Sequence, residues 1–250
     1  MIPKAKLKLI RSLERKKYRT DNNLFVVEGP KSVADMMTAF SCKYIAATKE
    51  WIDGNQDIVK NILCDELNQE ELRKTSFQEH PQQVIALFEL PEYNIEDINP
   101  QKQLILALDD IQNPGNLGTI IRIADWFGIN DIVCSEATAD AFSPKTVQAA
   151  MGSLARVRVH YINLKQWLKC IKKNVPVYGT FLNGDNIYET NLTDNGIIVM
   201  GNEGNGISPE IEQLVNHRIT IPNRNTAATH ADSLNVAIAT AITCSEFRRR

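Results

Sequence analysis

The chain has 250 residues, of which 43% are hydrophobic and 23% are charged, and its formal net charge is −2. This is long enough for one large domain or two modest ones. No apolar run approaches the roughly 20 residues that span a bilayer, and the first residues lack an apolar signal core, so we expect a globular cytoplasmic protein.

The cysteines exclude two further classes of protein. They number five, are scattered along the chain and form no C-x-x-C pair, which argues against a disulfide framework and against a zinc ribbon. We expect the thiols of Cys42, Cys64, Cys134, Cys170 and Cys244 to be reduced and mostly buried.

The first twenty residues are strongly basic, with Glu14 as their single acid. Leu7, Ile10 and Leu13 recur at helical spacing, which predicts a basic amphipathic helix. Charge this one-sided is what binding to a phosphate backbone requires, and a merely solvated helix face is the equally weighted alternative. The candidate polyanion-binding residues are Lys4, Lys8, Arg11, Arg15, Lys16, Lys17 and Arg19.

A small alternating α/β domain follows this helix. We expect strands at 24–27, 44–47, 62–63 and 84–88, and helices at 30–40 and 65–73. The stretch PEYNIEDINPQK contains prolines and no usable periodicity, which is typical of a linker. The sequence therefore predicts a first domain over 1–95, a linker over 96–102 and a second domain over 103–250.

The second domain opens with a strand, a glycine-rich loop and a helix. Residues 104–108 are an apolar run that Asp109 and Asp110 end, and residues 113–118 are turn formers. Apolar residues then recur at helical spacing, and Arg122 points away from their stripe. A unit of this kind usually opens a ligand crevice, because free backbone groups of the strand and the helix meet there.

The alternation continues to the end of the chain. We expect strands at 132–134, 157–161, 175–182, 197–200 and 218–221, and helices at 144–151, 164–173, from 208 and at 233–247. This order predicts a Rossmann-like α/β fold with a parallel sheet.

Three loops follow strands of this domain and should share one rim: NPGNLG, GNEGNG and IPNRNTAATHADSLN. The glycines Gly201, Gly204 and Gly206 have the wrong order for the dinucleotide-binding fingerprint, which argues against a nicotinamide oxidoreductase. None of these loops carries the Lys and Ser or Thr of a P-loop, so nucleotide triphosphate hydrolysis is also disfavoured.

The order NPGNLGTIIR, IVMGNEGNGI and IP followed by SLNVA resembles the three signature motifs of the SpoU/TrmH family of RNA ribose 2′-O-methyltransferases, in the SPOUT superfamily. The resemblance covers the second domain and implies a deep trefoil knot in its sheet, S-adenosylmethionine as methyl donor and a homodimer that completes the site. The first domain resembles the family's RNA-binding extension through its basic helix, RKKYR and FVVEG.

Carried over by position, the resemblance implies two sets of residues. The catalytic set is Arg122, Asn116, Glu203, Ser233 and Asn235, and the set around the cofactor is Thr180, Met200, Gly201, Ile221, Ser233 and Leu234. The stretch 222–232 departs from the family pattern, because it is longer and lacks a frequent glycine.

The acid–base properties of a guanidinium limit the roles that Arg122 can have. A guanidinium gives up its proton only with great difficulty, so it is a poor general base. We expect Arg122 to bind the target phosphate and to stabilise the developing alkoxide, with no metal involved. The structural alternatives are a turn role for Asn116, an ion pair of Arg122 with Asp125, a loop-holding role for Glu203 and a helix cap for Ser233.

The function predicted is methyl transfer to a ribose 2′-hydroxyl of structured RNA, with ribosomal RNA favoured over transfer RNA. A transfer RNA methyltransferase and a non-catalytic RNA-binding protein of the same fold remain the alternatives. The four histidines fit no catalytic or metal-ligand spacing.

Overall fold

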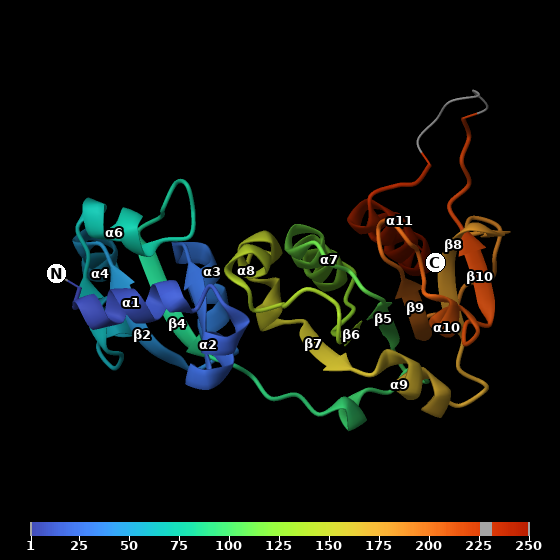
Figure 1. Ribbon diagram of the computed structural model, residues 1–250, viewed down its shortest axis with the longest axis horizontal. Helices are drawn as coiled ribbons and strands as arrows, with labels where there is room; N and C mark the ends of the chain where they lie inside the picture. The colour runs from blue at the N-terminus through green and yellow to red at the C-terminus, as the bar shows by residue number, and fades with distance from the viewer. Residues whose placement is uncertain (1, 226–231, 250) are drawn as a thin grey trace. The chain divides into compact units, whose positions relative to one another are not determined.

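The computed structural model describes residues 2–225 and 232–249, and the chain divides into two compact units, most of whose elements are labelled in Figure 1. The first unit comprises Met1–Glu92 and Asp140–Arg156, and the second comprises Tyr93–Ala139 and Val157–Arg250. The segment 140–156 therefore packs with the first unit, although the sequence boundaries had assigned it to the second domain.

The first unit is built on a four-stranded mixed sheet of order β1-β4-β2-β3, in which β4 is antiparallel to both neighbours and β3 is parallel to β2. Its strands are β1 (Leu24–Glu28), β2 (Cys42–Ala47), β3 (Cys64–Glu66) and β4 (Val84–Glu89). Its helices are α1 (Lys4–Ser12), α2 (Lys16–Asn22), α3 (Pro30–Met37), α4 (Lys49–Gly54), α5 (Gln56–Val59), α6 (Gln69–Thr75) and α8 (Pro144–Ala150), with a 3₁₀ turn η2 (Ser153–Ala155).

The basic region forms two helices, α1 and α2, where the sequence had predicted one. The chain turns after Ser12, and Arg19 of α2 reaches back to this turn. Its Nη1 donates to the carbonyl oxygens of Leu13 at 2.6 Å and Glu14 at 2.8 Å. Carbonyls at the end of a helix have no partner within the helix, and the guanidinium supplies one.

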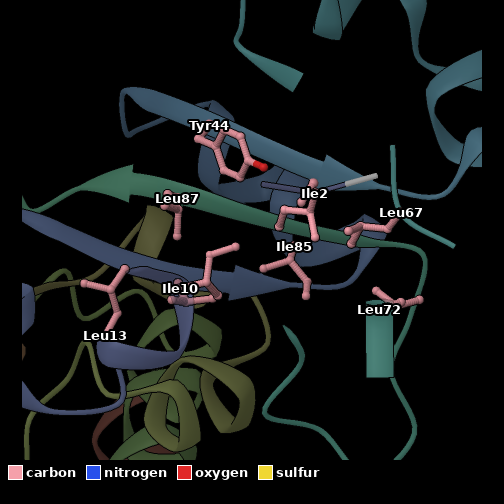
Figure 2. Packing of buried hydrophobic residues seen from close by; sticks show 10 residues of the cluster. Ile2, Ile10, Leu13, Tyr44, Leu67, Leu72, Ile85 and Leu87 are labelled. Carbon is pink, nitrogen blue, oxygen red and sulfur yellow. The ribbon is translucent and has the colours of Figure 1, made fainter. Parts of the chain in front are cut away.

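An apolar cluster lies between α1 and the sheet of the first unit (Figure 2). Ile10 and Leu13 are fully buried, and so is Ile85 of β4, with Leu87 almost so. Ile85 and Leu87 are two positions apart, so they share one face of β4. Each such side chain contributes about 1.5–3 kcal/mol by its burial, which fixes the basic helix to the sheet.

An aromatic cluster explains why the segment 140–156 belongs to the first unit. Phe142 precedes α8, and its ring centroid lies 4.8 Å from that of Phe25 in β1. Phe25 also contacts Phe40 at 5.3 Å, edge to face, and Phe88 at 5.8 Å. Aromatic contacts at these distances add to the area buried.

Several expected elements of the first unit differ from those found. Helices α4 and α5 were not predicted, and the third strand is Cys64–Glu66 instead of 62–63. The acidic helix α6 begins at Gln69, because Asn68 and Glu71 form a capping box in which each side chain binds the other's backbone amide.

The second unit is an α/β domain around a six-stranded, entirely parallel sheet of order β10-β8-β9-β5-β6-β7, as the sequence predicted. Its strands are β5 (Leu104–Leu108), β6 (Asp131–Ser135), β7 (Arg158–Ile162), β8 (Val177–Asn186), β9 (Gly196–Met200) and β10 (His217–Thr220). Its helices are α7 (Pro114–Trp126), α9 (Leu164–Cys170), α10 (Pro209–Glu212) and α11 (Val236–Arg248), with a 3₁₀ turn η1 (Ile95–Asp97).

The strand order reverses beside β5. This strand pairs with β6 on one side and with β9 on the other. Strand β6 is the next strand in the sequence, whereas β9 comes after β7 and β8. In open parallel sheets, ligands bind outside the carboxyl ends of the strands where the order reverses. The knot implied by the resemblance stays a prediction.

Two global properties complete the description. Within residues 2–225 and 232–249, the helices are all too short or too polar to cross a bilayer. All five cysteines are free thiols, but only Cys134 and Cys244 are buried, so the expectation of mostly buried thiols holds for two of them.

Candidate active site

The first motif forms the start of α7. Asn113 is the N-cap, and its Oδ1 accepts hydrogen bonds from the backbone amides of Gly115 at 2.8 Å and Asn116 at 3.2 Å. Pro114 occupies the first helical position, where its fixed φ suits the helix. The stretch that we expected to be a glycine-rich loop is thus mostly helix, and Asn116 lies on its first turn.

The second motif is a tight loop after β9. The backbones of Asn202 and Gly206 exchange two hydrogen bonds of 2.9 Å each. A Cβ atom on Gly201 would lie 2.2 Å from the Gly206 backbone, so this position requires glycine. The side chain of Asn202 closes the loop from inside, because its Oδ1 accepts from the amides of Gly204 at 2.9 Å and Asn205 at 3.1 Å.

Two residues that the sequence analysis did not assign to the site hold these motifs together. Asn202 Nδ2 donates to the carbonyl of Asp110 at 2.8 Å, which ties the second loop to the end of β5. The buried carboxylate of Asp109 accepts from the amide of Ser208 at 2.8 Å. The sequence gives no signal for either role, because each bond joins segments that are distant in sequence.

The third motif caps α11. Asn235 Oδ1 accepts from the backbone amides of Ala237 at 3.0 Å and Ile238 at 3.3 Å, so the helix begins at Val236 and not at Ser233 as predicted. The alternative role of Ser233 as the helix cap is therefore wrong. Asparagine is among the residues preferred at this position.

One hydrogen-bond chain joins the three motifs. Asn235 Nδ2 donates to Asn116 Oδ1 at 3.1 Å, and Asn116 Nδ2 donates to Glu203 Oε1 at 2.7 Å. These residues lie 119 and 87 positions apart in the sequence. We call this arrangement the Asn235–Asn116–Glu203 chain. It makes Asn116 more than a turn residue, since both ends of its carboxamide are engaged.

The residues expected around the cofactor follow neighbouring strands. Thr180 lies in β8, and its hydroxyl donates to the carbonyl of Val199 at 3.2 Å. Met200 ends β9 and is buried, Gly201 follows it, and Ile221 follows β10 and is half-buried. Ser233 and Leu234 are exposed before α11. Within the atypical stretch 222–232, residues 226–231 lie outside those that the structure describes.

Arg122 lies on the exposed side of α7, as its spacing predicted, whereas Ile120, Ile121 and Ala124 are buried. It follows Asn116 by six residues, a rise of about 9 Å along the helix. The buried face of α7 packs against α11 in the second unit.

The candidate RNA-binding residues in the first unit fall into three groups. Arg19 is 3% exposed and forms an ion pair of 2.5 Å with Asp140, so its prediction as an RNA contact is wrong. Arg11 is exposed, but its guanidinium donates to the carbonyl of Ser76 at 2.6 Å and lies over the ring of Phe77. The remaining candidates are exposed: Lys4, Lys8, Arg15, Lys16 and Lys17.

Two family models match the chain, one over each end of the sequence. Residues 103–245 match the model of the SpoU rRNA Methylase family, and residues 4–86 match that of an MRM3-like substrate binding domain. The chain is 32% identical to the 23S rRNA (guanosine(2553)-2′-O)-methyltransferase RlmP of Bacillus subtilis (strain 168), over 97% of this chain and 96% of that protein.

Solved structures resemble the whole chain. A TrmH-family protein from Porphyromonas gingivalis has a TM-score of 0.87 and 40% identity, over 100% of this chain and 99% of that one. An AdoMet-bound rRNA methyltransferase from Sinorhizobium meliloti has a TM-score of 0.86 and 30% identity, over 100% of this chain and 96% of that one. Each similarity extends over both units.

Proposed function

Because the chain belongs to the SpoU rRNA Methylase family, we propose that it transfers a methyl group from S-adenosylmethionine to a ribose 2′-hydroxyl of ribosomal RNA. The observation that carries this proposal is the Asn235–Asn116–Glu203 chain, which assembles the three motifs at one end of a parallel sheet. The similarity to RlmP over nearly the full length of both proteins supports ribosomal RNA over transfer RNA.

The residues at this end of the sheet fit the proposed cofactor. Several hydrogen-bonding groups there suit a zwitterionic sulfonium: the glycine backbone, the hydroxyls of Thr180 and Ser233, and the carboxylate of Glu203. The loops lack the lysine with which a P-loop binds nucleotide phosphates. Thr180, Met200, Gly201, Ile221, Ser233 and Leu234 would hold it. S-adenosylmethionine, when bound, supplies an electrophilic methyl group with a good leaving group.

The residues of the protein would then have two tasks, which are to align the reactants and to assist the loss of the hydroxyl proton. The 2′-hydroxyl oxygen would be held in line with the methyl carbon and the sulfur, so that the O–C bond forms as the C–S bond breaks, and the hydroxyl proton would pass to solvent late in this step. Arg122 binds the phosphate next to the target ribose and stabilises this charge, since a guanidinium stays protonated and presents paired donors. Its exposure on α7 is compatible with contact to a large RNA.

Asn116, Glu203 and Asn235 act as one set. Glu203 and Asn235 occupy both ends of the Asn116 carboxamide, which fixes the orientation of that group at the start of α7. Ser233 precedes Asn235 by two residues and contributes an exposed hydroxyl to the same rim. This set positions the ribose and the cofactor relative to Arg122.

RNA binding is assigned to the first unit, whose residues 4–86 match the substrate-binding model. The exposed cations Lys4, Lys8, Arg15, Lys16 and Lys17 provide the phosphate contacts. We propose a cytoplasmic location, because RlmP is a bacterial enzyme and bacterial ribosomes are assembled in the cytoplasm.

We also propose a homodimer formed by the second unit. Trp126 of α7 is 84% exposed and Ile238 of α11 is 53% exposed, and these two helices pack against each other. Large apolar side chains exposed on one helix pair are typical of an interface, and a second copy is the proposed occupant. Trp126→Arg should then yield monomers in sedimentation velocity, whereas a wild-type monomer would contradict the proposal.

Two measurements test the function. Calorimetric titration with S-adenosylmethionine should show binding to the wild-type protein, and an RNA-binding protein without catalysis would show none. Mapping of 2′-O-methyl groups in total RNA from a deletion strain should reveal the loss of one ribosomal mark. Loss of a transfer RNA mark instead would overturn the choice of substrate.

The role of Arg122 has its own test. Single-turnover rates for Arg122→Ala and Arg122→Lys should both fall well below that of the wild type, because lysine lacks the paired donors of the guanidinium. If Arg122→Lys keeps nearly full activity at neutral pH, the bidentate phosphate role is wrong.

A further inference from the structure

Tyr18 is an exposed aromatic residue in the middle of the basic region. Its side chain is 39% exposed, and it is the only exposed Phe, Tyr or Trp among the described residues of the first unit. No hydrogen bond of its hydroxyl occurs within the part of the chain that the structure describes. The ring therefore presents both an apolar face and a polar tip to the surroundings.

The backbone that carries Tyr18 is held firmly. The next residue, Arg19, is buried and bonded to two carbonyls of the turn before α2 and to Asp140. On the other side of the turn, Leu13 is buried in the apolar cluster under α1. Helix α2 is thus anchored by its buried residue Arg19, which holds the backbone that carries Tyr18.

Two cations lie close to Tyr18 in the sequence, and one acid, Asp21, follows it by three residues. Arg15 lies three residues before Tyr18, one helical turn away, and Lys17 directly precedes it. Both cations are exposed, and the first turn of α2 contains no acid. An exposed ring among solvated cations offers a flat face for stacking together with donors for phosphates, and single-stranded nucleic acid combines both complementary groups.

We propose that Tyr18 stacks on an unpaired base of the substrate RNA while Arg15 and Lys17 bind the phosphates that flank this base. This proposal rests on the proposed function as an RNA methyltransferase and adds the recognition of a loop or bulge to it. A regular RNA duplex keeps its bases stacked on one another, so it offers no free face to the ring.

The test compares substitutions of Tyr18 for binding to the RNA fragment that the wild-type enzyme methylates. Tyr18→Ala should weaken binding about 5- to 150-fold, which corresponds to about 1–3 kcal/mol per stacked base. Tyr18→Phe and Tyr18→Trp should bind like the wild type, because each keeps a flat ring. Tyr18→Leu retains apolar area without that ring, and its affinity should fall with that of Tyr18→Ala.

Salt dependence separates stacking from charge. The slope of log Kd against log salt should be unchanged in Tyr18→Ala, whereas Lys17→Ala should reduce it by about one phosphate contact. In turnover assays, the KM for RNA should rise with little change in kcat. Thermal unfolding of each variant should match the wild type, because the ring is exposed.

The outcomes are distinguishable. If Tyr18→Leu or Tyr18→Ala binds RNA as the wild type does while Lys17→Ala binds more weakly, the stacking proposal fails and the RNA-binding surface stands. If the wild-type protein binds neither RNA nor S-adenosylmethionine, the proposed function fails, and this inference falls with it.

Discussion

At the residue scale, the carboxamide of Asn116 decides whether three distant motifs act together. Its oxygen accepts from Asn235 and its nitrogen donates to Glu203. Only a carboxamide offers an acceptor and a donor on one planar group of this size. An aspartate in its place would lose the donor and set a second carboxylate beside Glu203.

Variants of this chain should therefore be strongly non-additive. Asn116→Ala and Glu203→Ala should each lower kcat/KM by about a hundredfold, since small misplacements of catalytic groups have effects of this size. The double variant should be little worse than the poorer single variant, because both remove the same hydrogen bond. Steady-state kinetics with RNA and S-adenosylmethionine, measured for the wild type, both single variants and the double variant, complete this double-mutant cycle.

The control for this cycle is Gln112→Ala. Gln112 is exposed, and within the described part of the chain its amide bonds only the side chain of Asp110, so activity should stay within about twofold of the wild type. If the loss of kcat/KM in the double variant equals the product of the losses in Asn116→Ala and Glu203→Ala, the two residues do not share a role.

The glycine loop allows a matched pair of substitutions. In Gly201→Ala the new Cβ would lie 2.2 Å from the Gly206 backbone, whereas in Gly204→Ala it would meet Asn202 Oδ1 at an ordinary 3.5 Å. Overpacking of this kind costs about 1–3 kcal/mol. Calorimetry should show weaker binding of S-adenosylmethionine to Gly201→Ala and unchanged binding to Gly204→Ala, and equal affinities would show that the loop does not shape the cofactor site.

The sequence was informative about which residues form the candidate site and less so about how they are held. Asn116, Glu203 and Asn235 could be named because the motif order carries them. Asn202 and Asp109 could not, because their bonds to Asp110 and Ser208 join segments that are distant in sequence. The prediction for Arg19 is wrong, since a cation in a basic run gives no sign of an ion-pair partner 121 residues away.

At the element scale, Asp131 joins three strands of the second unit at the start of β6. Its carboxylate is fully buried and accepts two hydrogen bonds from Arg158 of β7, at 2.8 and 2.7 Å. His160 Nε2 lies 3.0 Å from the same carboxylate, and Gln103, just before β5, donates to it at 3.1 Å. Burial opposes ionisation of this group, but the bonds from His160 and Arg158 outweigh it, so the pKa of Asp131 lies below its usual range.

The lowered pKa of Asp131 predicts how the free energy of unfolding depends on pH. An Asp whose pKa is lowered by folding stabilises the folded protein fully above its unfolded-state pKa of about 4. This stabilisation is lost as the pH falls through the lower pKa that the group has in the folded protein. Asp131→Asn should lower the free energy of unfolding at pH 7 by about 3 kcal/mol, at the low end for a broken buried pair because Arg158 is partly solvated.

Denaturant unfolding at several pH values checks this prediction. The difference between wild type and Asp131→Asn should be constant above about pH 5 and should shrink on further acidification. Asp194→Asn, at an exposed position, is the control and should change stability by less than about 0.5 kcal/mol. A difference that grows on acidification would contradict the assignment.

Elements with long apolar runs were predicted well, and those set by single contacts were not. Strands β4, β5 and β9 are continuous buried runs and were found within a residue of their bounds. The break between α1 and α2 depends on the Arg19 side chain, and the helical character of NPGNLG depends on the Asn113 cap. Periodicity does not report contacts of this kind.

At the scale of the whole molecule, the segment 140–156 interrupts the second unit in sequence and completes the first in space. It contributes Phe142 to the aromatic cluster and Asp140 to the buried ion pair with Arg19. The chain therefore passes between the units at three places, near residues 92, 139 and 156. The first unit cannot be complete when cut at the linker that the sequence suggested.

The Arg19–Asp140 pair tests this dependence in the intact chain. Asp140→Asn leaves a buried guanidinium without its counter-charge, and even in the wild type Arg19 Nε has no partner among the described residues. Removing one partner of a buried pair costs about 3–5 kcal/mol. In an Arg19→Met background the same substitution should cost less than about 1 kcal/mol, because no charge remains to be compensated. Thermal unfolding of the four proteins gives the coupling energy, and purely additive effects would mean that this ion pair does not hold the segment 140–156 on the first unit.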